Sequence, residues 1–281
     1  MADNPGISVL MTTYNRERFV EAAIRSVLAS TFSDFELLVI DDGSSDRTVA
    51  IVEQLSAEDR RVVLHINPQN LGDYPNRNRA ASLAKGKYLK YVDADDLIYP
   101  WGLQILWDCM EKHPNAGWGL CSLAQDKQRT FPFVLSPEEA YRYHYLGPGL
   151  FHKAPLSSII RKSVFDKVGG FQPLRMVGDS EMWHRLAQDS PVLLMPHGVV
   201  WYRHHDDQES NVIHEFALTY QTITHDYLTS EKCPLDKNQL QLIYTNRRRR
   251  LMRDIFVDFV KRDFKSVRST RMQLRELKPF T

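Results

Sequence analysis

The sequence predicts an α/β fold in which helices flank a mostly parallel central sheet, followed by a helical C-terminal extension. Two observations predict this class. Within the first hundred residues, short apolar runs alternate with stretches whose apolar residues recur at helical spacing. Beyond about residue 215, only the helical pattern continues. Strands that alternate with helices are joined by crossovers, and such connections produce a parallel sheet covered on both faces.

Four apolar runs in the first hundred residues are expected to form strands. Each run is short and rich in aliphatic or aromatic residues, as the buried strands of parallel sheets are. Between the first two runs, the apolar residues of segment 20–28 recur at i, i+3, i+4, i+7 and i+8, which predicts an amphipathic helix. Two further helices are expected around 49–55 and 80–84. The expected strands are 7–11, 36–40, 62–66 and 88–92.

The alternation weakens after residue 100. Residues 101–112 are expected to form a helix and residues 117–121 a strand, whereas the pattern of residues 126–154 is irregular. This irregular stretch is rich in aromatic residues, Pro and Gly, and loops of such length are often functional. Tyr143 and Tyr145 are among its aromatic residues.

The C-terminal part of the chain is expected to be helical and basic. Helices are predicted at 214–228 and 238–264, and residues 247–281 contain twelve Lys or Arg against four Asp or Glu. This segment could pack on the core, pack on a second copy of the chain, or contact anionic lipid as a peripheral surface. The sequence leaves these alternatives open. The whole chain has a formal net charge of only +1, which gives no reason to expect nucleic acid as a partner.

The sequence also bears on the compartment. Its three cysteines are widely spaced and form no CxxC pair, so neither a zinc site nor a disulfide framework is indicated. The first residues lack the basic and apolar regions of a signal peptide, and no apolar run is long enough to cross a bilayer. We therefore expect a cytoplasmic protein, peripheral at the inner face of the membrane if the basic segment binds lipid.

Polar residues follow three of the four expected strands. Thr12 and Tyr14 follow the first strand, Asp42 follows the second, and Asp93 and Asp95 follow the fourth. In parallel sheets ligands bind beyond the carboxyl ends of the strands, so these side chains are expected to converge there. Converging carboxylates repel one another unless a cation offsets them. Carboxylate oxygens suit hard divalent cations, which predicts a Mg²⁺ or Mn²⁺ site.

Each of these motifs alone also has a purely structural interpretation. Residues 42–45 could form only a turn and a helix N-cap. Residues 93–96 could form a solvated loop or the acidic start of the following helix. All such interpretations would have to hold together at three strand ends, so the sequence favours a binding site.

Four motifs occur in order along the chain: Thr12-Thr13-Tyr14-Asn15-Arg16, Asp41-Asp42-Gly43-Ser44-Ser45-Asp46, Asn70-Leu71-Gly72 with Asn76-Arg77-Asn78, and the DxD motif Asp93-Ala94-Asp95-Asp96. Together they resemble those of the family-2 inverting glycosyltransferases, whose fold is the GT-A (Rossmann-like) fold. The resemblance extends over about residues 7–210. It implies that residues 1–100 form the nucleotide-sugar-binding half of the domain and 101–215 its acceptor-binding half. Beyond about residue 215 the resemblance fades, and the helical and basic pattern predicts that residues 216–281 form a basic helical extension.

The resemblance implies roles for the residues that would bind the nucleotide sugar. Thr12 and Tyr14 would line the nucleobase pocket, with Tyr14 stacked on the base. Asp42 would accept a hydrogen bond from a base N–H, which favours uracil and therefore a UDP-linked donor. Arg77 would lie near the ribose or the phosphates, and Asp93 would contact the ribose or a metal-bound water.

The resemblance also implies the metal ligands and the general base. Asp95, with Asp96 beside it, would hold Mn²⁺ or Mg²⁺ against the diphosphate, and His205 would be a metal or diphosphate contact. Asp179 would take the proton of the acceptor hydroxyl, because an inverting transfer needs one such carboxylate. The family usually has Glu before this Asp, whereas this chain has Gly178.

Other protein classes fit the sequence less well. A nucleotidyltransferase would normally carry a Gly-rich basic loop after the first strand, and a dinucleotide-dependent oxidoreductase would carry GxGxxG there. Thr12-Thr13-Tyr14-Asn15 matches neither motif. The alternative from a different class is a catalytically inactive nucleotide-sugar-binding module. The acceptor is expected to be a saccharide or a lipid-linked molecule, and a homo-oligomer stays open. Because sugars expose apolar C–H faces, Tyr143 and Tyr145 are expected to form an aromatic wall for an acceptor sugar.

Overall fold

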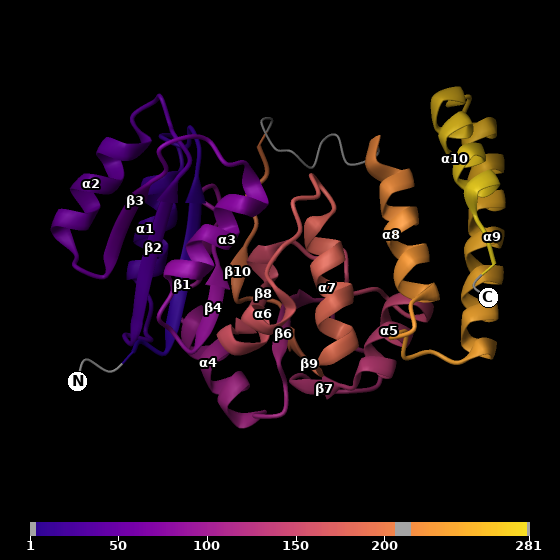
Figure 1. Ribbon diagram of the computed structural model, residues 1–281, viewed down its shortest axis with the longest axis horizontal. Coiled ribbons are helices and arrows are strands. Elements are labelled where there is room, and N and C mark those ends of the chain that lie inside the picture. The colour runs from indigo at the N-terminus through magenta and orange to yellow at the C-terminus, as the bar shows by residue number, and fades with distance from the viewer. Residues whose placement is uncertain (1–3, 206–214, 280–281) are drawn as a thin grey trace.

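The structure is a computed structural model that describes residues 4–205 and 215–279. Predictions that concern residues 1–3, 206–214 and 280–281 lie outside this described part. Within it, one eight-stranded sheet runs through the molecule with the strand order β3-β2-β1-β4-β8-β6-β9-β7, and helices cover both faces (Figure 1). The predicted α/β class with a central sheet is therefore confirmed.

The first half of the sheet is parallel, as the alternation of strands and helices predicts. It consists of β1 (Ile7–Thr13), β2 (Phe35–Asp41), β3 (Val62–Ile66) and β4 (Tyr88–Tyr91). Nearly every residue of β1, β2 and β4 is buried, because helices pack on both faces of these strands. All four strands run in one direction, so their carboxyl ends meet at one edge of the sheet.

Three helices connect these strands: α1 (Val20–Leu28), α2 (Thr48–Glu58) and α3 (Asp73–Leu83). The apolar positions that predict α1 are the ones that it buries, namely Val20, Ala23, Ile24 and Val27. The start of α3 is seven residues earlier than the sequence pattern predicts. Gly72 precedes it with a φ of 84°, a conformation that glycine adopts without strain, and the helix begins at the next residue.

The second half of the sheet is mixed. β8 is antiparallel to both β4 and β6, β6 is parallel to β9, and β7 is antiparallel to β9. β5 and β10 form a separate two-stranded sheet. The elements of this half are β5 (Leu97–Ile98), α4 (Gly102–Lys112), β6 (Trp118–Leu123), β7 (Phe133–Leu135), α5 (Pro137–Leu146), the 3-10 helix η1 (Pro155–Ser157), β8 (Ser158–Arg161), α6 (Lys162–Val168), α7 (Gly178–Asp189), β9 (Val192–Pro196) and β10 (Val200–Trp201).

Residues 126–154 are not irregular throughout, which corrects the sequence-based expectation. They contain β7 and α5, and α5 begins with a capping box in which the side chains of Ser136 and Glu139 bond each other's backbone N–H. The Tyr143 hydroxyl donates to Asp126, and Tyr145 contacts His184 in the core. Both tyrosines pack against the core, and neither lines the main cavity. The predicted aromatic acceptor wall is therefore wrong for these two residues.

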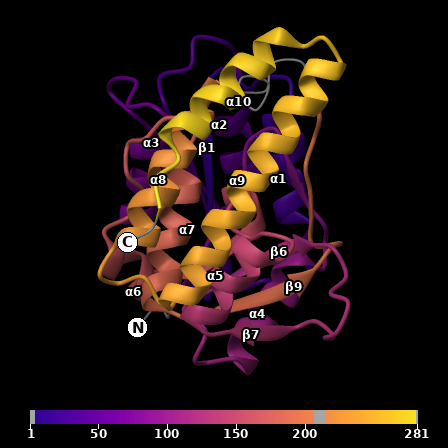
Figure 2. The same cartoon turned by 90° about the vertical axis from the view of Figure 1, so that its right-hand side faces the viewer.

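The C-terminal region consists of α8 (Ala217–Thr229), α9 (Lys237–Val260) and α10 (Phe264–Glu276). The single helix expected over 238–264 ends at Val260, because Arg262 adopts a φ of 59° and Asp263 caps the next helix at Ser266. α9 and α10 then run side by side in opposite directions as a hairpin (Figure 2). No helix in the described part of the chain combines the length and the apolar character needed to cross a bilayer.

The extension packs on the rest of the fold as part of one core. α8 contacts α7, and α9 contacts α5 (Figures 1 and 2). Leu228, Leu235 and Ile243 of this region are buried in the same apolar cluster as Trp118 and Trp183. Residues 217 onward therefore stabilise the helices that cover one face of the sheet.

Candidate active site

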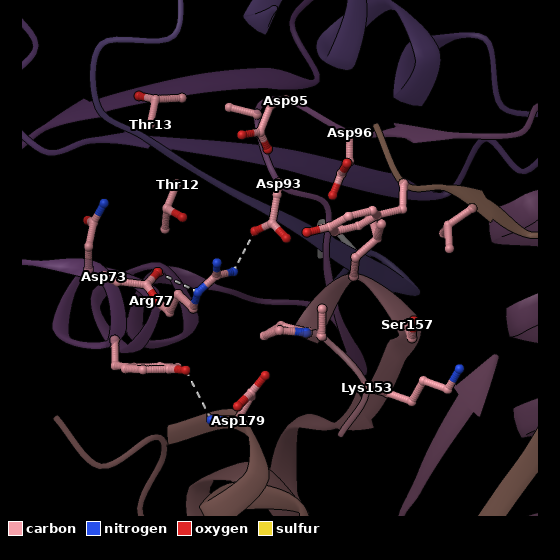
Figure 3. Close-up of a pocket in the computed structure, with 18 of the residues that line it drawn as sticks. Thr12, Thr13, Asp73, Arg77, Asp93, Asp95, Asp96, Lys153, Ser157 and Asp179 are labelled. Carbon is pink, nitrogen blue, oxygen red and sulfur yellow. Dashed lines mark hydrogen bonds and ion pairs between the residues drawn. The ribbon is translucent and has the colours of Figure 1, made fainter. Parts of the chain in front are cut away.

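A cavity of about 840 Å³ opens where the parallel strands end. It is within the size range of pockets that bind small molecules and cofactors. The carboxyl ends of β1, β2 and β4 line it, together with the first turns of α3, α7 and α8 (Figure 3). Seven of the eight residues that the sequence predicts for the site line this cavity: Thr12, Tyr14, Asp42, Arg77, Asp93, Asp95 and Asp179. The eighth, His205, contacts Asp95.

The two adjacent aspartates after β2 have different surroundings. The Asp41 carboxylate accepts hydrogen bonds from the Thr13 hydroxyl and the Ser44 backbone N–H, both at 2.8 Å, and it does not line the cavity. Asp42 lines the cavity, and its oxygens accept the backbone N–H groups of Leu71 and Gly72 at 2.8 and 2.9 Å. Asp41 therefore has the purely structural role of stabilising the turn after β2. Asp42 holds the loop before α3 against the cavity.

Tyr14 and Thr12 lie at the end of β1 with different exposures. Tyr14 is 50% exposed and lines the cavity, so part of its surface is accessible to a ligand there. Thr12 is half-buried in the cavity wall. Asn15, which follows Tyr14, has a φ of 52°, and its side chain accepts the backbone N–H of Ser45 at 2.8 Å. This contact ties the loop after β1 to the loop after β2.

Arg77 is the main cation in the wall of the cavity. Its Nε lies 2.7 Å from the Asp73 carboxylate, and one terminal nitrogen lies 2.7 Å from the Asp93 carboxylate (Figure 3). Burial alone would lower the pKa of Arg77, but the carboxylates of Asp73 and Asp93 outweigh it and hold this pKa well above its ordinary value. The guanidinium therefore stays charged and fixes the position of Asp93.

Basic side chains from distant parts of the sequence lie next to the DxD segment. Asp95 Oδ2 lies 3.3 Å from the Arg16 guanidinium and 3.1 Å from His205 Nε2. Asp96 is buried, and its carboxylate accepts the backbone N–H of Arg203 at 2.8 Å. Burial and the neighbouring Asp93 raise the pKa of Asp96 well above its usual range. Asp96 lines the cavity as Asp95 does, and its bond to Arg203 holds the 203–205 segment beside Asp95.

The residues around Asp95 fit a divalent cation in their donor chemistry. No group of three or more His, Cys, Asp and Glu side chains within the described ranges is arranged to hold a metal alone. Asp95 and His205 offer one carboxylate and one imidazole. Mg²⁺ and similar hard cations commonly take one or two protein ligands and complete their shell with water and substrate phosphates. The pair therefore suits a cation that arrives with a diphosphate, and Arg16 occupies part of that position here.

Asp179 lies at the first turn of α7, on the side of the cavity opposite Asp95 (Figure 3). Burial raises the pKa of Asp179 to about 6, although the backbone N–H of Ser180 donates to its carboxylate. A carboxylate with this pKa is deprotonated at neutral pH and is a stronger base than an exposed aspartate. The position and the pKa both suit a general base.

The ring of Tyr74 explains why this chain has Gly178 where the family usually has Glu. A Cβ at Gly178 would lie 2.7 Å from the ring of Tyr74, so no larger residue fits beside this tyrosine. The hydroxyl oxygen of Tyr74 accepts the backbone N–H of Asp179 at 3.1 Å. Tyr74 therefore occupies the space next to the base that a longer side chain at 178 would need.

Several cavity residues were missed by the sequence analysis. Arg16 and Asp73 stand inside or next to recognised motifs, so their charge was a usable signal. Tyr220 lies on α8, and its hydroxyl donates to the carbonyl of Met176 at 2.6 Å, three residues before Asp179. Met176 has a φ of 65°, so this bond holds a strained turn next to the base. Nothing in the periodicity of α8 distinguishes Tyr220 from the other aromatic residues.

Comparison with known proteins gives a consistent family and fold. The family model described as "Glycosyl transferase family 2" matches residues 8–169. A curated protein from Campylobacter jejuni, "GalNAc(5)-diNAcBac-PP-undecaprenol beta-1,3-glucosyltransferase", is 36% identical over 104 residues, covering 36% of this chain and 33% of that protein. The first curated relatives are likewise matched over only 36% to 39% of their own lengths.

Two solved structures show the same fold at low sequence identity. S. aureus TarS 1-349 in complex with UDP-GlcNAc is 16% identical with a TM-score of 0.63, and the match covers 96% of this chain and 91% of that chain. The mannosyltransferase PcManGT from Pyrobaculum calidifontis, in complex with GDP-Man and Mn²⁺, is 16% identical with a TM-score of 0.60. That match covers 81% of this chain and 64% of that chain. Both likenesses support the GT-A type of fold.

Proposed function

The chain belongs to glycosyl transferase family 2, whose model matches more than half of it, and we propose on this basis that it transfers a sugar from a nucleotide-diphospho-sugar to an acceptor hydroxyl. We further propose inversion at the anomeric carbon, a UDP-linked donor and a bound Mn²⁺ or Mg²⁺. One observation supports this proposal most directly. A single cavity contains Asp42, the Arg77–Asp93 pair, Asp95 and, on its other side, Asp179.

In the proposed reaction, Asp179 accepts the proton of the acceptor hydroxyl. At the same time, the oxygen of this hydroxyl attacks the anomeric carbon of the donor sugar. The bond between that carbon and the diphosphate oxygen breaks, and the electron pair leaves with the nucleoside diphosphate. Attack from the side opposite the leaving group inverts the anomeric centre. A divalent cation held by Asp95 and His205 would stabilise the charge that develops on the diphosphate. Arg77 keeps Asp93 in place beside the donor.

The donor base is proposed from the surroundings of Asp42. One Asp42 oxygen accepts two donors from the chain, Asn67 and Leu71, and the other accepts Gly72. A carboxylate has about four lone-pair positions, so one remains for a base N–H. Uracil and thymine carry such an N–H between two carbonyl groups. TarS is named with UDP-GlcNAc and PcManGT with GDP-Man, so the fold alone is compatible with either base.

The acceptor is proposed to be a saccharide or a lipid-linked molecule. The Campylobacter jejuni relative is named for an undecaprenol-linked acceptor, which supports the second class. In this proposal residues 1–100 bind the donor and residues 101–215 supply the acceptor side. The basic residues from 247 onward would hold the protein at the cytoplasmic face of a membrane.

The experiment that tests this proposal is release of free nucleoside diphosphate from a panel of nucleotide sugars, with Mn²⁺ or with EDTA. We expect turnover of one UDP-sugar, dependent on the cation and lost in an Asp95→Ala variant. Asp166→Ala is the matched control, because Asp166 is exposed and forms an ion pair only with Lys162 among the ion pairs of the described residues. Cation-dependent UDP binding without any turnover, with or without acceptor, would favour the inactive binding module. Absence of UDP binding would refute the proposal.

A further inference from the structure

The tip of the α9–α10 hairpin carries a cluster of exposed apolar side chains. Phe256, Phe259 and Phe264 are 67%, 58% and 64% exposed, and Val260 is 65% exposed. Phe256, Phe259 and Val260 follow one another at helical spacing on the last turns of α9, and the rings of Phe259 and Phe264 are in contact, with centroids 6.3 Å apart. These residues therefore form one continuous surface, which we call the hairpin tip.

The hairpin does not need these side chains for its own packing. Leu251 of α9 and Val267 of α10 are buried, and the two helices contact each other. Three exposed phenylalanines within nine residues are unusual, because a buried aromatic side chain stabilises a fold by several times the thermal energy. Nothing in the described part of the chain covers them, so they are available to something outside the chain.

The positive charge around the hairpin tip favours an anionic partner. Residues 249–268 contain seven Lys or Arg and three Asp or Glu, a local excess of +4. Arg253, Lys261, Arg262 and Lys265 are all exposed around the apolar residues. Aromatic residues that project from a ring of basic side chains are typical of surfaces that enter the headgroup region of an anionic bilayer. A second copy of the chain would bring the same positive charges together.

The position of the hairpin tip relative to the cavity strengthens this interpretation. α9 runs toward the end of the molecule at which α7 and α8 begin, and the parallel strands end there as well (Figures 1 and 2). Asp179, at the start of α7, and Tyr220, in the first turns of α8, both line the cavity. A bilayer against the hairpin tip would therefore lie on the side of the molecule where the cavity is.

We propose that the hairpin tip is a membrane-docking site for an anionic bilayer. Phe256, Phe259, Val260 and Phe264 enter the headgroup region, while the surrounding Lys and Arg side chains bind anionic headgroups. Docking in this orientation presents the cavity to acceptors carried by lipids in the same bilayer. This last consequence rests on the proposed function, whereas docking itself does not depend on it.

The experiment is vesicle flotation of the full chain without donor or acceptor. Vesicles of phosphatidylcholine with 30% phosphatidylserine are compared with vesicles of phosphatidylcholine alone. We expect at least tenfold tighter binding to the anionic vesicles. We expect a Phe256→Ser, Phe259→Ser, Phe264→Ser triple variant to bind at least tenfold more weakly, with unchanged UDP release in solution. A Leu242→Ser, Met272→Ser variant is the matched control, because both residues are exposed on the same hairpin away from its tip.

Three results would overturn the proposal. The first is absence of binding of the unchanged protein to anionic vesicles. The second is equal binding by the triple variant and the unchanged protein. The third is a triple substitution that converts a dimer to a monomer in sedimentation and weakens binding to uncharged and anionic vesicles alike, which would assign the tip to a second copy. UDP release is measured separately in solution, so failure of docking and failure of the proposed enzymatic activity are distinguishable.

Discussion

Replacement of Asp179 by Asn is expected to slow transfer strongly and to stabilise the fold. Burial raises the pKa of this carboxyl from 3.8 to about 6. A pKa that is higher in the folded state means that the folded protein disfavours the charged form. The resulting cost is absent below the unfolded pKa, grows between pH 4 and pH 6, and is complete above pH 6. A shift of about two pH units corresponds to roughly 3 kcal/mol at neutral pH.

Asn removes this charge and keeps an oxygen for the Ser180 N–H. We expect the variant to be more stable by about 1–3 kcal/mol at pH 7.5, or roughly 3–9 °C in melting temperature. The gain should shrink to about half near pH 5, because most of the wild-type carboxyl is protonated in the folded state there. Transfer should fall by about 10²–10⁴-fold, while UDP still raises the melting temperature.

The measurements are thermal melts between pH 5 and pH 8 and transfer rates over the same range. In the unchanged protein, kcat/KM for transfer should decline below about pH 6 as Asp179 becomes protonated. Asp189→Asn, at the other end of α7, is the matched control and should retain transfer. Near-normal transfer by the Asp179 variant would refute the role as base. A stability gain that is independent of pH, or a loss, would refute the account of its pKa.

Three further changes test the surroundings of the cavity. Arg77→Lys cannot reach both Asp73 and Asp93, so we expect a loss of about 1–3 kcal/mol and weaker UDP binding, and unchanged melts would contradict this. Gly178→Glu should lower the free energy of unfolding by about 1–3 kcal/mol because the new side chain collides with Tyr74, and the loss should be smaller in combination with Tyr74→Ala. Strictly additive effects of the two substitutions on the denaturation midpoint would refute the collision. Tyr220→Phe should lower kcat for transfer about 3–10-fold with unchanged UDP affinity, because the Met176 turn loosens; an equal loss of UDP affinity would contradict this role.

The donor side of the fold could be predicted because its signals are local. Each parallel strand is an unbroken apolar run, and the order of strand, polar end and helix fixes where the polar side chains meet. Asp42 and Asp95 could be placed in the cavity on this reasoning alone. The distinction between Asp41 and Asp42 could be made only through the resemblance, because the turn that separates their side chains depends on contacts with Thr13 and Leu71.

The acceptor side depends on contacts between distant segments, which a single sequence does not reveal. α5 was missed because Pro132 and the Gly147-Pro148-Gly149 run mark its surroundings as a loop, although the Ser136–Glu139 capping signal was present. The break between α9 and α10 contains neither Gly nor Pro, and it depends on the conformation of Arg262. Arg16 and Asp95 are 79 positions apart in the sequence, so no local sequence pattern could predict their ion pair.

Tyr220 also bears on how relatives of this chain could exchange acceptors. Tyr220 of α8 lines the cavity and lies outside residues 8–169, which carry the family match. Recombination that joins the preceding part of this chain to a different C-terminal segment would therefore replace part of the cavity lining along with the surface of the protein. Chimeras cut at residue 216 should inherit the sugar donor of one parent and part of the acceptor preference of the other. Diversity among such enzymes could then arise by exchange of whole segments as well as by point substitution.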